Sequence, residues 1–129
     1  MTITRDLVIK IHQDLIARTG GLNGIRDEGL LDSSIASAHQ TFGGNDLYPD
    51  NVSKSIRLSY NLIMNHPFVD GNKRIGMHML ILSLRFHDFT FKPSNEEVIK
   101  YGLGLASHQI NYDEFSHWVN EVINRKKHY

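Results

Sequence analysis

HPFVDGNKR, at residues 66–74, is the stretch that decides this fold, because it leads from a tight polar loop into an apolar run at residues 75–86. Apolar side chains recur in that run at helical spacing, in one stripe of Ile75, Met79, Leu82 and Phe86 and a second stripe of Met77, Leu80 and Leu84. A helix that is apolar around most of its circumference lies inside a domain, against other helices. The stretch therefore predicts a long central helix that starts near Asp70, its N-cap candidate.

The start of this helix is predicted to bind an anion. Its first backbone N–H groups have no intrahelical partner, and they carry the positive end of the helix dipole. Gly71 and Asn72 allow the backbone to turn close to a ligand, and Lys73 and Arg74 add two cationic side chains. Phosphate is the anion that a helix N-terminus of this kind most often takes.

Further helices are predicted on both sides of the central one, each beginning at a residue that can cap a helix. Their expected bounds are Thr4 to Thr19, Asp27 to about His39, and Asn51 or Ser53 to Met64, with two more beginning at Ser94 and at Asn111 or Asp113. Pro67 disfavours an α conformation at His66 and so ends the third of these helices before the motif. We expect one all-α domain over residues 1–129, a compact bundle of about six helices around the central helix.

Several residues outside the polar motif positions are expected to have structural roles. Phe68 is interpreted as a core anchor that holds the loop, and His12 as a surface or packing residue of the first helix. For Asp27 and Arg26 we favour a helix cap and a surface charge over contact with a ligand. Gly76 lowers the helix propensity of its segment and is explained only by close packing.

Residues 41–51 form the longest irregular segment, which contains two glycines and one proline. Loops of about this length inside a compact domain are often functional. The alternative is a plain connector between helices, with its aromatic side chains folded onto the core. A short extended link at residues 87–93 is a candidate to pair with this segment.

The motif at residues 66–74 resembles that of the Fic superfamily, His-x-Phe-x-Asp/Glu-Gly-Asn-x-Arg, and Lys73 is typical of its Doc (death-on-curing) branch. The similarity continues upstream at residues 20–22, 25–31, 41–44 and 46–49 and covers most of residues 1–90. It implies a flap, often a short hairpin near the active site, that receives the target's backbone as an added strand. The residues of this expected flap are Thr41, Phe42, Gly43, Gly44, Asn45, Asp46, Leu47 and Tyr48.

The motif contains the groups that transfer of a phosphoryl or nucleotidyl group requires. His66 is the expected base for the attacking hydroxyl, and Asp70 the expected oxygen ligand for Mg²⁺. Gly71, Asn72 and the helix N-terminus are expected to form the anion hole, while Arg74 grips phosphate bidentately. A zinc site is disfavoured, because Pro67 and Gly71 interrupt any helix that would align the histidine with the aspartate. The expected cofactors are therefore ATP and Mg²⁺.

Two positions distinguish the chain from most Fic-like proteins that transfer AMP. Lys73 stands where those proteins have glycine, and Met77 stands where they have a second arginine. In the Doc branch, this change accompanies a nucleotide bound the other way round, with its γ-phosphate facing the histidine. The resemblance thus implies a toxin of a type II toxin–antitoxin system, a protein kinase that phosphorylates a hydroxyl of a translation factor, with elongation factor Tu the suggested target. The alternatives are a Fic-type AMP transferase and a catalytically inactive binding module.

The chain lacks the Ser/Thr-x-x-x-Glu-Gly/Asn motif by which some Fic-like proteins inhibit themselves. The resemblance therefore implies restraint by a small, partly disordered antitoxin that folds into a helix on binding. Fourteen basic and fourteen acidic residues cancel, which argues against direct binding of nucleic acid or of an anionic membrane surface. With no cysteine, no signal-peptide pattern and no apolar run of about 20 residues, we expect a soluble cytoplasmic protein.

Overall fold

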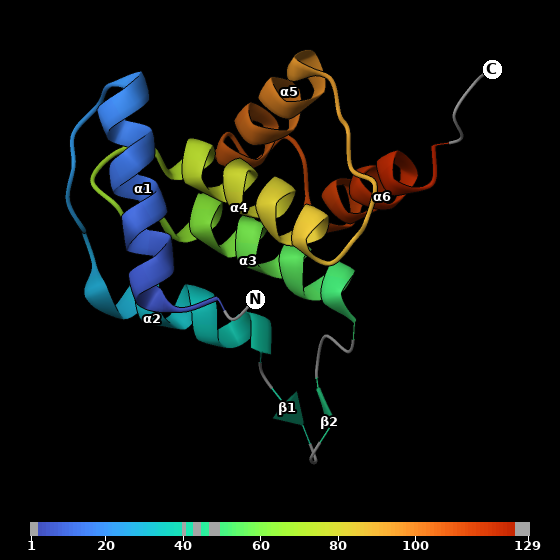
Figure 1. Cartoon of the computed structure of the whole chain (residues 1–129), viewed down its shortest axis with the longest axis horizontal. Coiled ribbons are helices and arrows are strands. Elements are labelled where there is room, and N and C mark those ends of the chain that lie inside the picture. The colour runs from blue at the N-terminus through green and yellow to red at the C-terminus, as the bar shows by residue number, and fades with distance from the viewer. Residues whose placement is uncertain (1–2, 40, 43–44, 47–49, 126–129) are drawn as a thin grey trace.

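The computed structural model describes residues 3–39, 41–42, 45–46 and 50–125. Within these residues the chain is almost entirely helical, which confirms the predicted all-α bundle (Figure 1). The elements are α1 (Arg5–Thr19), α2 (Glu28–Ala36), the 3-10 helix η1 (Ser37–His39), β1 (Thr41–Phe42), β2 (Asn45–Asp46), α3 (Asn51–Asn65), α4 (Asn72–Phe86), α5 (Asn95–Ala106) and α6 (Tyr112–Ile123). No helix in the described ranges combines the length and the apolarity needed to cross a membrane.

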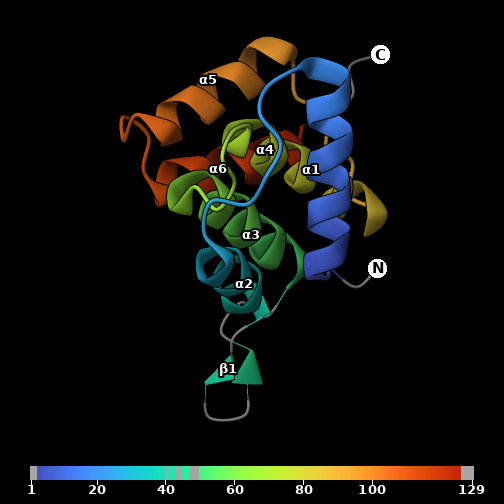
Figure 2. The ribbon, with the colours of Figure 1, turned by 90° about the vertical axis from the view of Figure 1, so that its left-hand side faces the viewer.

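The helix α4 is the centre of the bundle, with α1 and α2 on one side and α5 and α6 on the other (Figures 1 and 2). Its two predicted apolar stripes enter two different cores. Ile75 and Met79 pack with side chains of α1, α2 and α3. Leu80 and Leu84 pack with side chains of α3, α5 and α6. Only Phe86, the last residue of the first stripe, departs from the prediction, since it is 52% exposed at the end of the helix.

The close packing expected at Gly76 is confirmed, and it brings α4 against α3. A Cβ atom added at Gly76 would lie 2.5 Å from Cγ1 of Ile63 and 3.0 Å from the carbonyl oxygen of Ser59. Both neighbours belong to α3, and Ser59 O is a backbone atom that cannot rotate away. The absence of a side chain at Gly76 therefore sets the distance between the two helices that flank the motif.

Most helix starts are capped as the sequence predicts, with side-chain caps from Thr4, Asp27, Ser94 and Asn111. The helix α3 begins at Asn51, as predicted, and its N-cap is Asp50, whose carboxylate accepts a hydrogen bond from Ser53 N at 2.7 Å. One prediction is wrong. The N-cap of α4 is Gly71 in the left-handed region (φ 77°), without a side-chain cap, because the Asp70 carboxylate binds other backbone groups.

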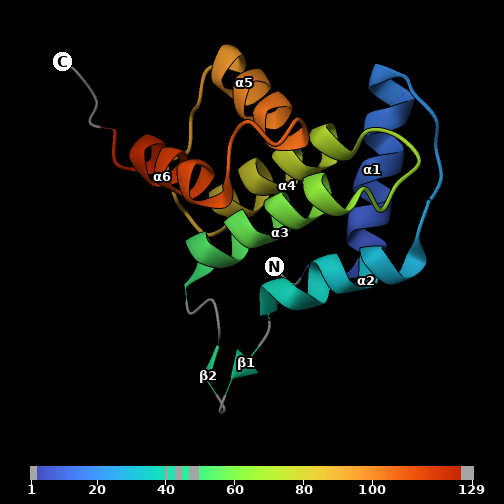
Figure 3. The ribbon, with the colours of Figure 1, turned by 180° about the vertical axis from the view of Figure 1, so that it is seen from behind.

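The expected hairpin is present as an antiparallel pair, in which Thr41 faces Asp46 and Phe42 faces Asn45. Its position differs from the expectation of a flap near the active site. The strands project from the bundle beside the start of α3, whereas the motif follows the end of that helix (Figures 1 and 3). The 15 residues of α3 span about 22 Å, so this helix separates the hairpin from the motif. The other flap residues, Gly43, Gly44, Leu47 and Tyr48, lie outside the described residues.

The link at residues 87–93 does not pair with the hairpin, since the sheet of the described residues contains β1 and β2 alone. Phe91 is fully buried in the core instead. The guanidinium of Arg85 donates to the carbonyl oxygen of Phe91 from Nε at 3.2 Å and from Nη2 at 3.1 Å. The link is therefore hydrogen-bonded to the end of α4.

Candidate active site

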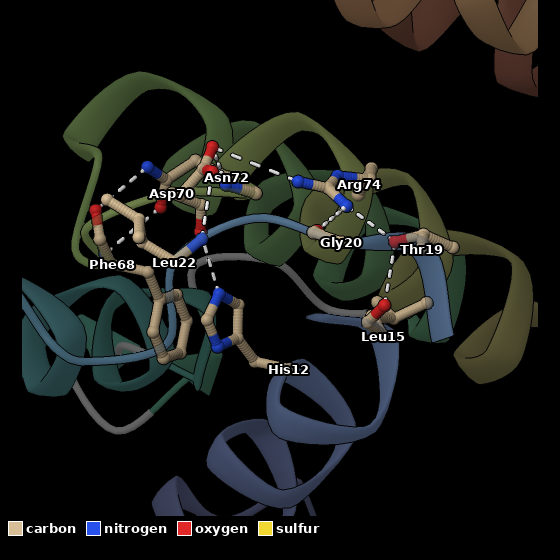
Figure 4. Close-up of polar contacts among 10 residues, drawn as sticks. His12, Leu15, Thr19, Gly20, Leu22, Phe68, Asp70, Asn72 and Arg74 are labelled. Atoms are coloured by element: carbon tan, nitrogen blue, oxygen red, sulfur yellow. Dashed lines mark hydrogen bonds and ion pairs between the residues drawn. The ribbon is translucent and has the colours of Figure 1, made fainter. Parts of the chain in front are cut away.

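The loop between α3 and α4 is closed by the side chain of Asn72. Its Oδ1 accepts a hydrogen bond from Phe68 N and its Nδ2 donates to Phe68 O, each at 3.0 Å (Figure 4). Both ends of the Asn72 amide are thus used within the loop. In this geometry a phosphate would meet the backbone N–H of Asn72 rather than its side chain.

Phe68 is buried, which confirms its role as the anchor of the loop. Its ring stacks on the imidazole of His12 with a centroid distance of 3.8 Å and an interplanar angle of 8°. The other contact of His12 is with the backbone of Asp70, where Nε2 lies 2.7 Å from the carbonyl oxygen (Figure 4). Because a carbonyl only accepts, Nε2 is the protonated nitrogen. The packing role expected for His12 is confirmed, and the residue it packs against is the motif itself.

Burial lowers the pKa of His12, an effect that outweighs the opposing hydrogen bond with the Asp70 carbonyl. The neighbouring charge of Arg74 lowers it further. The neutral imidazole is therefore the form that supports the loop near pH 7.

The carboxylate of Asp70 is ionised and open to solvent on one side. Its Oδ2 accepts from Leu22 N at 3.1 Å and its Oδ1 from Gly71 N at 2.8 Å. These two backbone donors, Leu22 first, hold the pKa of Asp70 below its ordinary value. With a side chain 45% exposed, the carboxylate fits the role of one oxygen ligand for Mg²⁺. The described residues contain no group of three or more His, Cys, Asp or Glu side chains that could hold a metal, so phosphate oxygens and water would supply the other ligands.

Arg74 joins the motif to the end of α1. Its Nη1 donates to Thr19 Oγ1 and to Gly20 O, and its Nη2 lies 3.8 Å from Asp70 Oδ1 (Figure 4). The backbone after α1 passes directly over this pair, since a Cβ added at Gly21 would lie 2.6 Å from Asp70 Oδ2 and 2.9 Å from Arg74 Nη2. Gly21 also has φ 113°, so only glycine fits there without strain.

Arg26 is exposed, as the predicted surface charge would be, but it also has a role that the prediction did not include. Its guanidinium donates from Nε to His66 O at 2.6 Å and from Nη2 to Asn65 O at 2.8 Å. The residue therefore binds the backbone where α3 ends and the motif begins. The reasoning from sequence missed Gly21, Leu22 and Arg26 as parts of the site, although the resemblance at residues 20–22 and 25–31 was a signal for all three.

The first turn of α4 contains backbone donors that its own helical hydrogen bonds do not use. The first helical bond of α4 runs from Ile75 N to Gly71 O at 2.9 Å, so the N–H groups of Asn72, Lys73 and Arg74 precede the hydrogen-bonded ladder. Lys73 is exposed. The structure thus brings Asp70, the Gly71–Arg74 backbone and the Arg74 guanidinium together, with His66 exposed on the same loop.

An apolar groove adjoins this helix start. It lies between α1, α4 and α5 and encloses about 390 Å³, with Lys73 and Arg74 among its lining residues. We call it the α5 groove. Its other lining side chains are mainly apolar and include Leu15, Met77, Ile81, Val98, Ile99 and Leu103.

Comparison with known proteins agrees with the motif. The family model described as the Fic/DOC family matches residues 2–84. A protein named "Toxin Doc" from Mycolicibacterium smegmatis (strain ATCC 700084 / mc(2)155) is 46% identical over 55 residues, which are 43% of this chain and 42% of that protein. The matched region thus spans less than half of that relative.

Proposed function

Because the chain belongs to the Fic/DOC family, we propose that it is the toxin of a toxin–antitoxin system and acts as a protein kinase on a translation factor. The observation that carries this proposal is the juxtaposition at the start of α4. An ionised carboxylate from Asp70, the guanidinium of Arg74 and unpaired backbone N–H groups occupy one place, and His66 lies exposed on the same loop. This set of groups suits a nucleotide phosphate chain and its metal.

In the proposed reaction, His66 accepts the proton of the target's hydroxyl group as the hydroxyl oxygen attacks the γ-phosphorus of ATP. The new oxygen–phosphorus bond forms while the bond from the γ-phosphorus to the bridging oxygen breaks, and ADP leaves. Arg74 and the first N–H groups of α4 bind phosphate oxygens and offset their charge. Mg²⁺, held by Asp70, would supply further neutralisation of the phosphate chain.

The choice of phosphoryl over AMP transfer is supported by positions 73 and 77. Lys73 adds a charged side chain at the first turn of α4, where glycine would leave the approach open. Met77 is 4% exposed and packs in the core shared with α3, α5 and α6, so this position offers no second cationic clamp. Both features favour the nucleotide pose with the γ-phosphate toward His66.

The experiment that tests this function uses the purified protein with Mg²⁺, a bacterial cell extract and ATP labelled at either the α- or the γ-phosphate. We expect γ-label on one protein, identified by comparison with purified elongation factor Tu, and no label with His66→Ala. Retention of the α-label would favour the AMP transferase instead. If neither label reached any protein, transferase activity would be contradicted, and the catalytically inactive binding module would be the remaining candidate.

We also propose that the antitoxin places a helix in the α5 groove, and not beside the hairpin. Ile99 and Leu103 are spaced as successive turns of α5 and are 60% and 53% exposed. They form an apolar edge that suits the apolar face of an amphipathic helix. Lys73 and Arg74, which line the groove, suit acidic residues on that antitoxin helix.

The test measures whether co-expression of a small neighbouring gene relieves the growth arrest that the chain causes. We expect Ile99→Asp with Leu103→Asp to keep the arrest but lose the relief. Phe86→Asp is the matched control, because Phe86 is similarly exposed at 52% but lies at the end of α4 and does not line the groove. Full relief of the double variant would show that the antitoxin binds elsewhere.

A further inference from the structure

The backbone at His66 adopts a conformation that needs support. His66 follows the last residue of α3 and has φ 49° and ψ 55°, in the left-handed region. Residues with a Cβ atom rarely adopt this region, because Cβ approaches the following carbonyl. Surrounding contacts must therefore hold His66 in place.

The usual support for such a turn is missing here. Where a left-handed residue ends a helix, the N–H groups of that residue and the next commonly bind the last carbonyl groups of the helix. Pro67 follows His66 and has no N–H group to donate. The carbonyl groups around the end of α3 are then left to water or to donors from elsewhere in the chain.

Arg26 provides these donors from a segment 40 residues away in the sequence. Its side chain binds His66 O at 2.6 Å and Asn65 O at 2.8 Å. Its own N–H binds Pro67 O at 2.8 Å, and the N–H of Asp27 binds the same oxygen at 3.1 Å. Two adjacent residues thus bind three consecutive carbonyl groups around the motif histidine.

The support is attached to a rigid element. Asp27 is the N-cap of α2, with its Oδ1 accepting from Leu30 N at 2.9 Å. The imidazole of His66, by contrast, makes no hydrogen bond to any residue that the structure describes, and the residue is exposed. The backbone of His66, which Arg26 binds, therefore sets the direction of the Cα–Cβ bond that carries the ring.

We propose that Arg26 is a positioning residue, which holds the His66 backbone in the left-handed conformation and so directs the imidazole toward the reacting hydroxyl. This inference rests on the proposed role of His66 as the base. Arg26 binds through two nitrogen atoms of one planar group, so lysine, with a single ammonium, replaces only part of this contact.

The test compares Arg26→Ala and Arg26→Lys with Arg85→Ala in the full chain. Arg85 is the matched control, because it also uses Nε and Nη2 to bind a backbone carbonyl, at Phe91 on the far end of α4. The first measurement is the backbone carbon chemical shifts of His66 by NMR. The second is kcat and KM for ATP in transfer of the γ-label to the target.

We expect Arg26→Ala to move the His66 shifts away from left-handed values and to lower kcat by about 10- to 100-fold, with KM for ATP changed less than about threefold. Arg26→Lys should fall between Arg26→Ala and wild type, and Arg85→Ala should leave the His66 shifts and kcat unchanged despite a similar change in Tm. Unchanged His66 shifts in Arg26→Ala would overturn the inference. If wild-type protein transfers no label, the proposed function fails, while the NMR comparison still decides whether Arg26 holds His66.

Discussion

Substituting Gly76 by alanine is a direct test of how closely α4 packs against α3. Helix propensity alone favours the change by about 1 kcal/mol, because alanine restricts the unfolded chain and glycine does not. The structure opposes it, since the new Cβ would lie 2.5 Å from Ile63 Cγ1 and 3.0 Å from Ser59 O. Forcing a methyl group into a closed core costs about 1 to 3 kcal/mol.

The atoms involved place the cost near the upper end of that range. Ser59 O is backbone and moves only with α3, and Ile63 Cγ1 moves only if the β-branched side chain leaves its χ1 rotamer. We therefore expect Gly76→Ala to lose about 1 to 2 kcal/mol of unfolding free energy after the gain in propensity. For a domain of this size that corresponds to a fall in Tm of about 4 to 8 °C.

Gly102→Ala is the matched control, because Gly102 also lies within a helix but has room around it. Its nearest neighbour would be Met77 Cγ at 3.5 Å, an ordinary contact. We expect this variant to gain up to about 1 kcal/mol, the opposite sign from Gly76→Ala. Urea unfolding measures the change in unfolding free energy of both variants, provided that the slope of free energy against urea concentration is the same for each.

The reasoning would be refuted if Gly76→Ala were stabilised as much as Gly102→Ala, since helix propensity would then decide and the two helices could not be so close. A second check uses Ile63→Ala, which removes the clashing side-chain atoms. On that background, the cost of Gly76→Ala should shrink by at least about 1 kcal/mol in a double-mutant cycle.

Three further outcomes are expected. His66→Ala and Asp70→Ala should each abolish label transfer and growth arrest while keeping the helical circular dichroism of wild type, because neither side chain is part of the core. Lys73→Gly should weaken transfer of the γ-label and permit only feeble transfer of the α-label, since Met77 leaves no second cationic clamp. Glu97→Gln should flatten the loss of stability in acid, because hydrogen bonds from the Arg125 guanidinium, and then from Ser94 N and the Trp118 side chain, hold the pKa of Glu97 well below its ordinary value.

The sign for Glu97 follows from its lowered pKa. Its stabilising contribution is present above the pKa of an unfolded glutamate, about 4.3, and is lost as the pH falls below that value. Urea midpoints between about pH 5 and pH 2 should thus fall more steeply for wild type than for Glu97→Gln, and parallel curves would contradict this. For the motif, growth arrest by His66→Ala at wild-type expression would contradict its role. Wild-type transfer of the α-label would contradict the role given to Lys73.

The sequence by itself determined the helices and indicated the family. Caps such as Thr4, Asp27, Ser94 and Asn111 act on backbone groups within one helical turn, so their effect can be inferred locally. The spacing of apolar residues after the motif likewise defined both stripes of α4, and the two cores of the folded chain correspond to them. The motif also indicated the family, which the matching family model shows.

Only the tertiary structure decided how the motif is held. Asp70 does not cap α4, because the N–H of Leu22, 48 residues earlier in the chain, binds its carboxylate. His12 contacts the Asp70 carbonyl across 58 residues, and Arg26 contacts the His66 carbonyl across 40. A local pattern cannot distinguish such donors from surface side chains, since a hydrogen bond depends on atoms within about 3 Å and not on spacing along the chain.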